Sequence, residues 1–416
     1  MGRFIVEGGN KLKGEVKING SKNAALAIIP ATILSNGPCL LKNLPNISDV
    51  ELSFEILKKM GAIVKRQDEH TVLIDNTTIN CNEVPFELAM KMRASYYYLG
   101  ALLTRFKEAN VAMPGGCNFG VRPINLHLKG FKMLGADYEI DAGIIHLKAK
   151  ELIGGKIYFD VVSVGATINI LLAAVKAKGA TIIENAAKEP HIVDLANFLN
   201  SMGANIIGAG TNVIKIKGVE SLNSSSYTII PDQIEAGSYM AMAAVTRGEI
   251  LVRDVTLKHL ESILNKIETI GVKIKKYDSS VFVSCDCELN KADVTSQAYP
   301  GFPTDMQPQI TAVLTFAKGT SIITEGIWAN RFQYVGELCR MGALITVDGK
   351  VAVVEGKQTL KAAPVTACDL RAGAALVIAA LGAQGKSEIE NVSYIERGYE
   401  NIVGKLKALG AAIEKV

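Results

Sequence analysis

Leu338-Cys-Arg-Met-Gly342-Ala is one of six similar stretches that decide the fold of this chain, because each has the pattern of a helix that ends at a glycine. A residue just past a helix often adopts a left-handed conformation, which glycine tolerates best. The six glycines are 68 to 74 residues apart, and a spacing this regular predicts six structural repeats. The other five stretches are Leu57-Lys-Lys-Met-Gly61-Ala, Phe131-Lys-Met-Leu-Gly135-Ala, Leu199-Asn-Ser-Met-Gly203-Ala, Ile267-Glu-Thr-Ile-Gly271-Val and Leu406-Lys-Ala-Leu-Gly410-Ala.

Two strand-like runs follow these glycines. The run from Ala343 to Glu355 alternates apolar and polar residues, turns at Asp348-Gly349 and alternates again. This two-residue period with an Asp-Gly turn is typical of an antiparallel hairpin. Each repeat is therefore predicted to be an α/β unit with a hairpin after its second helix.

The sixth repeat is incomplete, because the chain ends at Val416 after only one strand-like run. The amino-terminal run Arg3-Phe-Ile-Val-Glu-Gly8 is similar to the second strand of the other copies, so we predict that the two chain ends pair. With three repeats in each domain, one domain is expected to span residues 22–230, and the other residues 1–21 and 231–416. The two crossings, near Lys22 and Pro231, are expected to act as hinges.

Composition is that of an enzyme-sized cytoplasmic protein. The chain has 416 residues, of which 49% are hydrophobic and 21% charged, and a net charge of +4. It has no dense Lys/Arg run, no apolar stretch of membrane-spanning length and no secretory signal pattern, so nucleic-acid and membrane partners are not expected. Seven cysteines spread over the chain favour a reducing compartment. A monomer is the simplest expectation.

Short polar clusters occur at the same place in every repeat, just before a small apolar helix. Helix amino termini attract anions through their free N–H groups and their dipole, and three of the clusters add a basic residue, so we predict an anion site. The alternative is that Ser, Asp and Asn merely cap helices and that Lys and Arg are solvated. The clusters are Ser21-Lys22-Asn23, Met92-Arg93-Ala-Ser95, Ser163-Val164-Gly165-Ala-Thr167, Asp232-Gln-Ile-Glu235, Thr304-Asp305-Met-Gln307 and Asp369-Leu-Arg371.

The segment Pro114-Gly-Gly-Cys117-Asn-Phe-Gly-Val-Arg122-Pro123 has three glycines and two prolines, which exclude regular structure and indicate a flap. We expect Cys117 to be reactive, because Arg122 favours its thiolate. The other cysteines are interpreted as small buried side chains. Cys285-Asp-Cys287 has no second Cys/His pair nearby, so packing is favoured over a metal site.

Three further residues also have an interpretation without a function. Asp305 could cap a helix, Arg397 could be a surface charge, and His127 could be a packed ring. His70, His146, His191 and His259 have neither triad nor metal spacing, which argues against hydrolase and zinc chemistry.

These motifs together resemble the enolpyruvyl transferases, and within them the branch that uses a sugar nucleotide as acceptor. The resemblance covers nearly the whole chain and implies two inside-out α/β barrels of three repeats each, with the active site in the cleft between them. It is found in Phe4-Ile-Val-Glu-Gly-Gly9, Gly20-Ser-Lys22-Asn23-Ala-Ala, Pro114-Gly-Gly-Cys117, Arg122-Pro, Ser163-Val-Gly-Ala-Thr167, Glu184-Asn-Ala-Ala187, Tyr299-Pro-Gly-Phe-Pro-Thr-Asp305-Met-Gln307, Asp369-Leu-Arg371-Ala and Arg397-Gly-Tyr399.

The resemblance implies transfer of the enolpyruvyl group of phosphoenolpyruvate to the 3′-hydroxyl of UDP-N-acetylglucosamine, with release of phosphate and without cofactor or metal. It implies that Cys117 donates a proton, forms a covalent adduct with phosphoenolpyruvate and reacts with the epoxide fosfomycin. Asp305 then resembles the general base, and Lys22, Arg122 and Arg397 resemble a clamp on phosphate and carboxylate, with Arg371 close by.

The same resemblance implies the substrate contacts. These are Asn23, Arg93, Arg122, Pro123, Ile124, Asn125, Leu126, the run Val161-Val162-Ser163-Val164-Gly165, and Ile327 against the sugar. The chain departs from the better-known pattern at Asn125, Val161, His191 and Gln233, which affects the nucleotide contacts.

Two rival functions stay open. The sister enzymes that make 5-enolpyruvylshikimate 3-phosphate share the fold and the donor but lack the Pro-Gly-Gly-Cys motif. A repeat scaffold that binds anionic partners without catalysis is the other alternative, because a fold does not fix a function.

Overall fold

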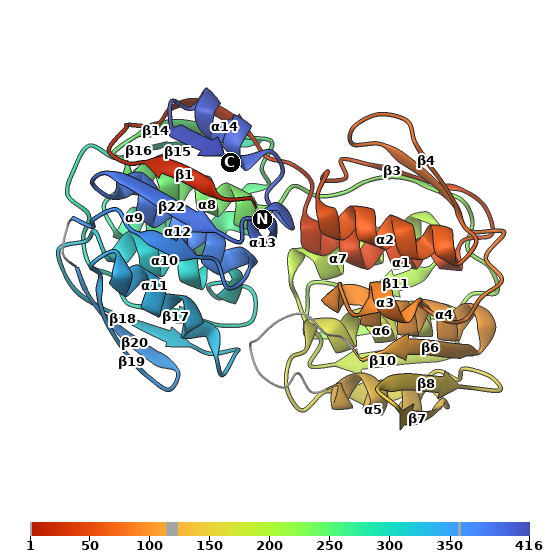
Figure 1. Cartoon of the computed structure of the whole chain (residues 1–416). Coiled ribbons are helices and arrows are strands. Elements are labelled where there is room, and N and C mark those ends of the chain that lie inside the picture. The colour runs from red at the N-terminus through yellow and green to blue at the C-terminus, as the bar shows by residue number, and fades with distance from the viewer. Residues whose placement is uncertain (1, 114–123, 357–358) are drawn as a thin grey trace. The chain divides into compact units, whose positions relative to one another are not determined.

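The computed structural model describes residues 2–113, 124–356 and 359–416, which form two compact units (Figure 1). Unit 1 comprises the described residues up to Asn19 and from Pro231 onward, and unit 2 those from Gly20 to Ile230. The hinge role predicted for the crossings stays a prediction. None of the described helices has the length and apolarity that crossing a bilayer requires.

The strands of the described residues form six small sheets, three in each unit. A typical sheet has one parallel pair at one edge and antiparallel pairs at the other, as in the order β17-β18-β20-β19. The strands of unit 1 are β1 (Phe4–Glu7), β2 (Lys13–Lys17), β14 (Glu249–Arg253), β15 (Lys273–Lys276), β16 (Ser280–Ser284), β17 (Val294–Ser296), β18 (Gly319–Glu325), β19 (Leu344–Asp348), β20 (Val351–Gly356), β21 (Pro364–Thr366), β22 (Lys386–Glu390) and β23 (Ala412–Lys415). Those of unit 2 are β3 (Cys39–Lys42), β4 (Ile63–Arg66), β5 (Val72–Asp75), β6 (Glu108–Ala112), β7 (Asp137–Asp141), β8 (Ile144–Lys148), β9 (Lys156–Tyr158), β10 (Ala180–Glu184), β11 (Asn205–Ile207), β12 (Val213–Lys217) and β13 (Ser226–Thr228).

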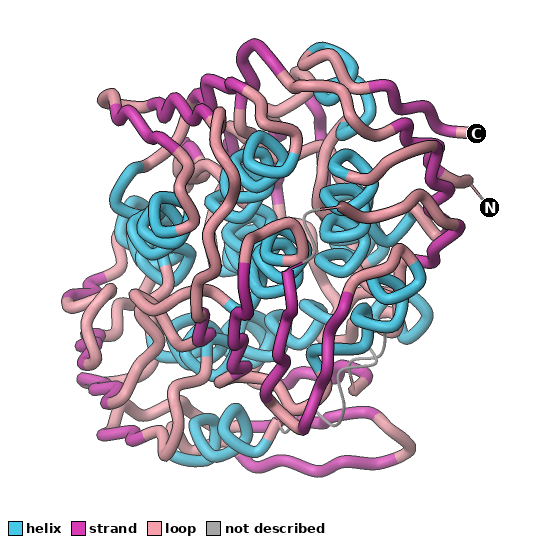
Figure 2. Tube along the Cα trace, turned by 90° about the vertical axis from the view of Figure 1, so that its left-hand side faces the viewer, coloured by secondary structure: helices cyan, strands magenta, loops and turns pink. Residues whose placement is uncertain are grey.

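Three helices in each unit are buried on nearly every face, so they form the inside while the sheets lie outside. Small and aliphatic side chains allow this, since a helix that is apolar all round belongs in a core. Figure 2 shows strands around the outside of helical coils. The inner helices are α1 (Lys22–Ala31), α4 (Tyr98–Phe106) and α6 (Val164–Ala174) in unit 2, and α8 (Gln233–Val245), α10 (Gln307–Leu314) and α12 (Leu370–Gly382) in unit 1.

Six further helices of the described residues are less completely buried and end two residues before the repeated glycines. Helix α9 buries Leu260, Ile263, Leu264 and Ile267, which is the spacing of a single helical stripe. These helices are α2 (Ser48–Lys59), α5 (Asn125–Met133), α7 (Pro190–Ser201), α9 (Leu257–Thr269), α11 (Val335–Arg340) and α14 (Ile402–Ala408). The short elements are α3 (Phe86–Ala89), α13 (Ser393–Glu396) and the 3₁₀ helices η1 (Thr32–Leu34), η2 (Arg93–Tyr97), η3 (Thr304–Met306) and η4 (Arg331–Tyr334).

The glycines past these helices have the predicted left-handed conformation. Their φ angles lie between +89° and +104°, for Gly61, Gly135, Gly203, Gly271, Gly342 and Gly410. The hairpin predicted after Gly342 is also confirmed, with β19 antiparallel to β20. Asp348 is still paired with Val351, so Gly349 and Lys350 make the turn rather than Asp-Gly.

The two chain ends pair as predicted. Strand β1 lies between β22 and β23 and is antiparallel to both, with Phe4 opposite Ile389 on one side and Lys415 on the other (Figure 1). At the two crossings between the units, the last strand before the crossing and the helix after it belong to different units. Strand β2 pairs with β14 in unit 1 although α1, which follows it, belongs to unit 2, and β13 pairs with β3 in unit 2 although the following α8 belongs to unit 1.

Candidate active site

The polar clusters of the repeats lie at the amino ends of the inner helices. In four of them the capping interpretation is confirmed. Ser21 and Ser163 accept a hydrogen bond from the N–H three residues on, at 3.4 and 3.3 Å, and Asp232 and Asp369 each accept two. The other two clusters begin with the 3₁₀ helices η2 and η3, in which neither Arg93 nor Asp305 caps a helix.

Lys22, the first residue of α1, is buried in an ion pair. Its Nζ lies 2.7 Å from Oδ2 of Asp49, in the first turn of α2, and the two side chains are only 10% and 5% exposed. A buried lysine keeps its charge most readily beside such a partner. Asp49 was not predicted, because an acidic residue in the first turn of a helix is ordinary.

A second cluster in unit 2 joins η2, α4, α5 and α6. Asn169 of α6 donates to the Tyr96 carbonyl at 3.0 Å and to Nδ1 of His127 at 2.8 Å, and accepts from the N–H of Gly100 at 2.9 Å. The His127 ring is buried and packs edge-on against Tyr96. Burial, and then the charge of Arg93, lower the pKa of His127 to about 3. His127 is therefore a neutral packed ring.

The predicted nucleotide contacts of unit 2 flank this cluster. Ile124 precedes α5, Asn125 and Leu126 begin it, and Ser163, Val164 and Gly165 begin α6. A Cβ at Gly165 would lie 2.8 Å from Cε1 of His127, so the ring and the start of α6 are in close contact. Arg93 begins η2, which contacts α1, the helix of Lys22 and Asn23.

Asp305 is the centre of the candidate site in unit 1. Its Oδ2 accepts hydrogen bonds from Nη2 and Nε of Arg371 at 3.0 and 3.3 Å, and its Oδ1 lies 3.8 Å from Nη2 of Arg331. Burial is the largest single influence on Arg371 and lowers its pKa, but the charges of Asp305, Tyr399 and Asp232, with the hydrogen bond to Asp305, together raise the pKa above its usual value. Both arginines are buried, whereas the Asp305 side chain is 32% exposed.

The segment of Arg397 lies near the amino end of α12, the helix of Arg371. Tyr399 is buried beneath the Arg371 guanidinium, whose Cζ lies 5.7 Å from the ring centroid. A Cβ at Gly398 would lie 2.7 Å from Leu370, the first residue of α12, so the 397–399 segment packs against that helix. Asp305, Arg371 and the Arg397 segment therefore belong to one cluster in unit 1.

Comparisons with known proteins show the family of the chain. Residues 6–406 match the family model described as EPSP synthase (3-phosphoshikimate 1-carboxyvinyltransferase). The chain belongs to this family of enolpyruvyl transferases. It is 52% identical over the full length of both chains to UDP-N-acetylglucosamine 1-carboxyvinyltransferase 3 of Caldanaerobacter subterraneus subsp. tengcongensis, and equally identical to a UDP-N-acetylglucosamine 1-carboxyvinyltransferase of Clostridium botulinum.

Solved structures support the same fold. The enolpyruvyl transferase NikO from Streptomyces tendae superposes with a TM-score of 0.91 at 26% identity, covering 100% of this chain and 99% of that one. An EPSP synthase from Acinetobacter baumannii covers both chains fully with a TM-score of 0.77 at 16% identity, which indicates a shared fold alone. The predicted enolpyruvyl transferase fold and its classification as an enzyme are thus confirmed.

Several residues predicted for the transferase site lie outside the described residues. They are Cys117, Arg122 and Pro123, so the predicted flap and its thiol stay predictions. The six described cysteines are free thiols. Cys39 and Cys285 are buried, as expected for packing, but Cys81, Cys287 and Cys368 are partly exposed and Cys339 is exposed, so the burial expected for these four is wrong.

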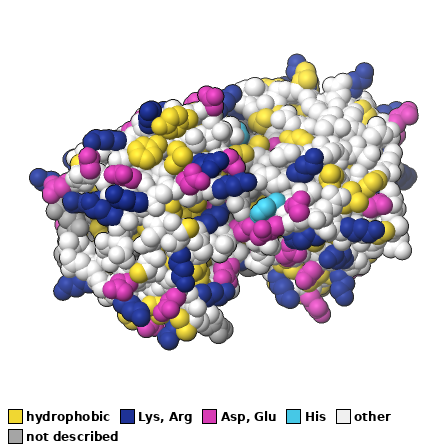
Figure 3. Space-filling view, turned by 90° about the horizontal axis from the view of Figure 1, so that it is seen from above, with side chains coloured by type: hydrophobic (Ala, Val, Ile, Leu, Met, Phe, Trp, Pro, Cys, Tyr) yellow, Lys and Arg dark blue, Asp and Glu magenta, His cyan; other side chains and the backbone are white. Residues whose placement is uncertain are grey.

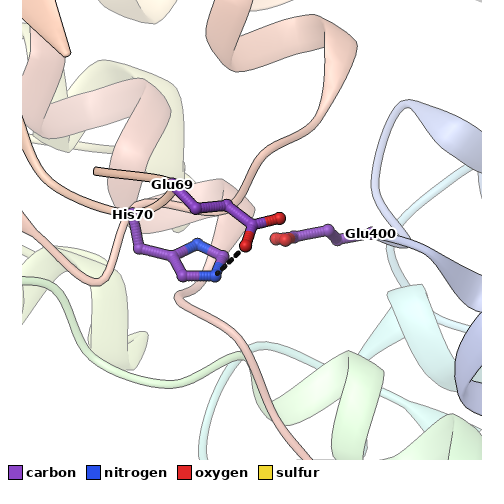
Figure 4. A group of neighbouring side chains, drawn as sticks. All are labelled: Glu69, His70 and Glu400. Atoms are coloured by element: carbon purple, nitrogen blue, oxygen red, sulfur yellow. Dashed lines mark ion pairs between the residues drawn. The ribbon is translucent and has the colours of Figure 1, made fainter. Parts of the chain in front are cut away.

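His70 does not alter the expectation of metal-free chemistry. Its Nε2 lies 3.9 Å from Oε2 of the exposed Glu69 in unit 2 (Figure 4). Figure 4 also draws Glu400, which belongs to unit 1, where it bonds to Asn19. The expected absence of a metal stays a prediction.

Charge is mixed on one face of the enzyme. On the face shown in Figure 3, basic and acidic side chains are interspersed, in keeping with the net charge of +4. The expected lack of nucleic-acid binding stays a prediction.

Proposed function

We propose that this enolpyruvyl transferase moves the enolpyruvyl group of phosphoenolpyruvate to the 3′-hydroxyl of UDP-N-acetylglucosamine and releases phosphate, the first committed step of peptidoglycan synthesis. The reaction takes place in the cytoplasm, on small-molecule substrates, with the enzyme as a monomer. Names of relatives at 52% identity over the full length support the choice of acceptor. The pairing of the partly exposed Asp305 with Arg371 is the structural observation on which the proposal depends.

Addition is the first half of the reaction. Asp305 accepts the proton of the 3′-hydroxyl as the oxygen attacks C2 of phosphoenolpyruvate, while Cys117 gives a proton to the C3 methylene, which yields a tetrahedral intermediate. The two arginines beside Asp305 keep it ionised, as a base must be, and hold both of its oxygens in place.

Elimination completes the reaction. The Cys117 thiolate takes a proton back from C3, the double bond reforms between C2 and C3, and the bond from C2 to the phosphate oxygen breaks. The phosphate leaves with the electron pair of that bond and takes up the proton that Asp305 accepted. Lys22, Arg122 and Arg397 hold phosphate and carboxylate, and the amino ends of the inner helices add N–H groups that favour anions. Asn23, Arg93, the start of α5, the start of α6 and Ile327 bind the sugar nucleotide.

A phosphate-release assay tests the proposal. Release is expected with phosphoenolpyruvate and UDP-N-acetylglucosamine, and none with phosphoenolpyruvate and shikimate 3-phosphate. Cys117→Ala and Asp305→Ala are each expected to lose at least about 100-fold in kcat, the usual scale for a missing acid or base. Full activity in both variants would contradict the assignment, and turnover of shikimate 3-phosphate would favour the sister activity.

Fosfomycin tests the thiol alone. Incubation with this epoxide is expected to raise the protein mass by that of one molecule in the wild type and not in Cys117→Ala. An unchanged wild-type mass would rule out a reactive Cys117.

A further inference from the structure

Glu325 is a buried carboxylate that no predicted role explains. It is the last residue of β18, where β18 runs parallel to β17, and its side chain is 1% exposed. A carboxylate is rarely buried without donors around it, because it loses its hydration. The donors around Glu325 therefore indicate what it does.

Those donors come from two segments. The backbone N–H groups of Ile327 and Trp328 donate to its Oε1 at 2.9 and 3.0 Å. The hydroxyl of Thr304, in η3, donates to both oxygens at 3.1 and 3.0 Å. An ionised carboxylate accepts all of these at once, since it has about four acceptor positions.

The Thr304 segment continues into the proposed base. The Thr304 carbonyl accepts a hydrogen bond from Nη2 of Arg331 at 3.2 Å, and the same nitrogen lies 3.8 Å from Asp305. Glu325 thus fixes the orientation of the residue before Asp305, while Arg331 contacts both residues.

The Ile327 turn is fixed from the other side as well. The N–H of Gly326 bonds to Ser296 at the end of β17, and a Cβ at Gly326 would lie 2.2 Å from the Ser296 carbonyl oxygen. The turn therefore has little room to move, and Glu325 links it to η3.

We propose that Glu325 is a positioning residue, which through Thr304 sets the geometry of Asp305 and through two N–H groups sets the Ile327 turn that meets the sugar. This inference depends on the proposed function. The Glu325 carboxylate then aligns Asp305 with the hydroxyl that Asp305 deprotonates. Glu325 itself contacts neither substrate in this proposal.

Thr304→Val is the decisive variant, because it removes the hydroxyl and keeps the shape. It is expected to lower kcat by about 10- to 100-fold, the cost of a small misplacement of a reacting group, with little change in the KM for UDP-N-acetylglucosamine. Thr304→Ser restores the hydroxyl and is expected to restore kcat. Thr324→Val, the same change one residue before Glu325, is the matched control and should behave as wild type.

Glu325→Ala removes both links, so it is expected to lower kcat and also to raise the KM for the sugar nucleotide. If Glu325→Ala fails to fold, the comparison of Thr304→Val with Thr304→Ser still tests the inference. A Thr304→Val enzyme as active as Thr324→Val, or a Thr304→Ser enzyme as slow as Thr304→Val, would overturn the inference.

Asp305→Asn, measured in the same assay, separates this inference from the proposed function. Loss of activity in Asp305→Asn with an unaffected Thr304→Val would overturn the positioning role alone. Full activity in Asp305→Asn would overturn the proposed base, and with it any role of Glu325 through it.

Discussion

Removing the partner of Lys22 is the sharpest test of how the transferase holds a cation in its interior. Asp49→Ala deletes the carboxylate 2.7 Å from Nζ, in a pair whose side chains are 10% and 5% exposed. Breaking a buried pair costs about 3–5 kcal/mol, because the remaining charge loses a close counter-charge in a place that water hardly reaches. At roughly 2–4 °C per kcal/mol for a unit of this size, Tm should fall by about 6–20 °C.

An exposed pair of the same length supplies the control. Lys129 and Asp160 are also 2.7 Å apart and lie in the same unit, but their side chains are 42% and 68% exposed. Water already solvates both groups, so Asp160→Ala should leave Tm unchanged within error. Thermal unfolding followed by circular dichroism measures both variants.

Phosphoenolpyruvate adds a second readout. If Lys22 binds its phosphate, the ligand replaces the missing anion, and saturating phosphoenolpyruvate should raise the Tm of Asp49→Ala more than that of wild type. Equal Tm losses in Asp49→Ala and Asp160→Ala would refute the energetic reasoning. An equal ligand effect in Asp49→Ala and wild type would refute the placement of phosphate beside Lys22.

Two further perturbations have definite expected outcomes. Gly165→Ala puts a Cβ 2.8 Å from the His127 ring, so it should lower the free energy of unfolding by about 1–3 kcal/mol and raise the KM for the sugar nucleotide. Gly336 is at an open helix position, so Gly336→Ala is the control and should be neutral or slightly stabilising. Equal Tm values for the two variants would refute the clash. Burial raises the pKa of Asp194 to about 6 against the opposing hydrogen bond from Tyr227, so the native state binds the extra proton between about pH 4 and 6. Wild-type stability should therefore fall as pH rises through that window, and denaturant titrations should show a flatter profile for Asp194→Asn.

The repeat plan could be predicted from sequence because it depends on local conformation. Gly342 and its equivalents must follow a helix with positive φ, and the run after Gly342 alternates as a strand does. The pairing of the chain ends followed from counting strands in an incomplete copy. Lys22, Asp305 and Arg371 were identified by resemblance and by their place at helix starts.

The partners of these residues could not be predicted. Asp305 meets Arg371 across 66 residues of sequence, and Glu325 meets Thr304 across 21, so both contacts depend on how β18, η3 and α12 pack together. Glu325 ends a strand of mixed Thr, Ser and Ile residues, where a carboxylate is an ordinary strand-end residue until its donors are known.

The position of β1 between β22 and β23 has a consequence for synthesis on the ribosome. Phe4 pairs with Ile389, 385 residues later, so this strand waits for its neighbours while almost the whole chain is translated. At about 5–20 residues per second, the wait is roughly 20–80 s. Unit 2 lacks this constraint and is free to fold first, whereas β1 must remain exposed, and open to mispairing or chaperones, until β22 and β23 have been made.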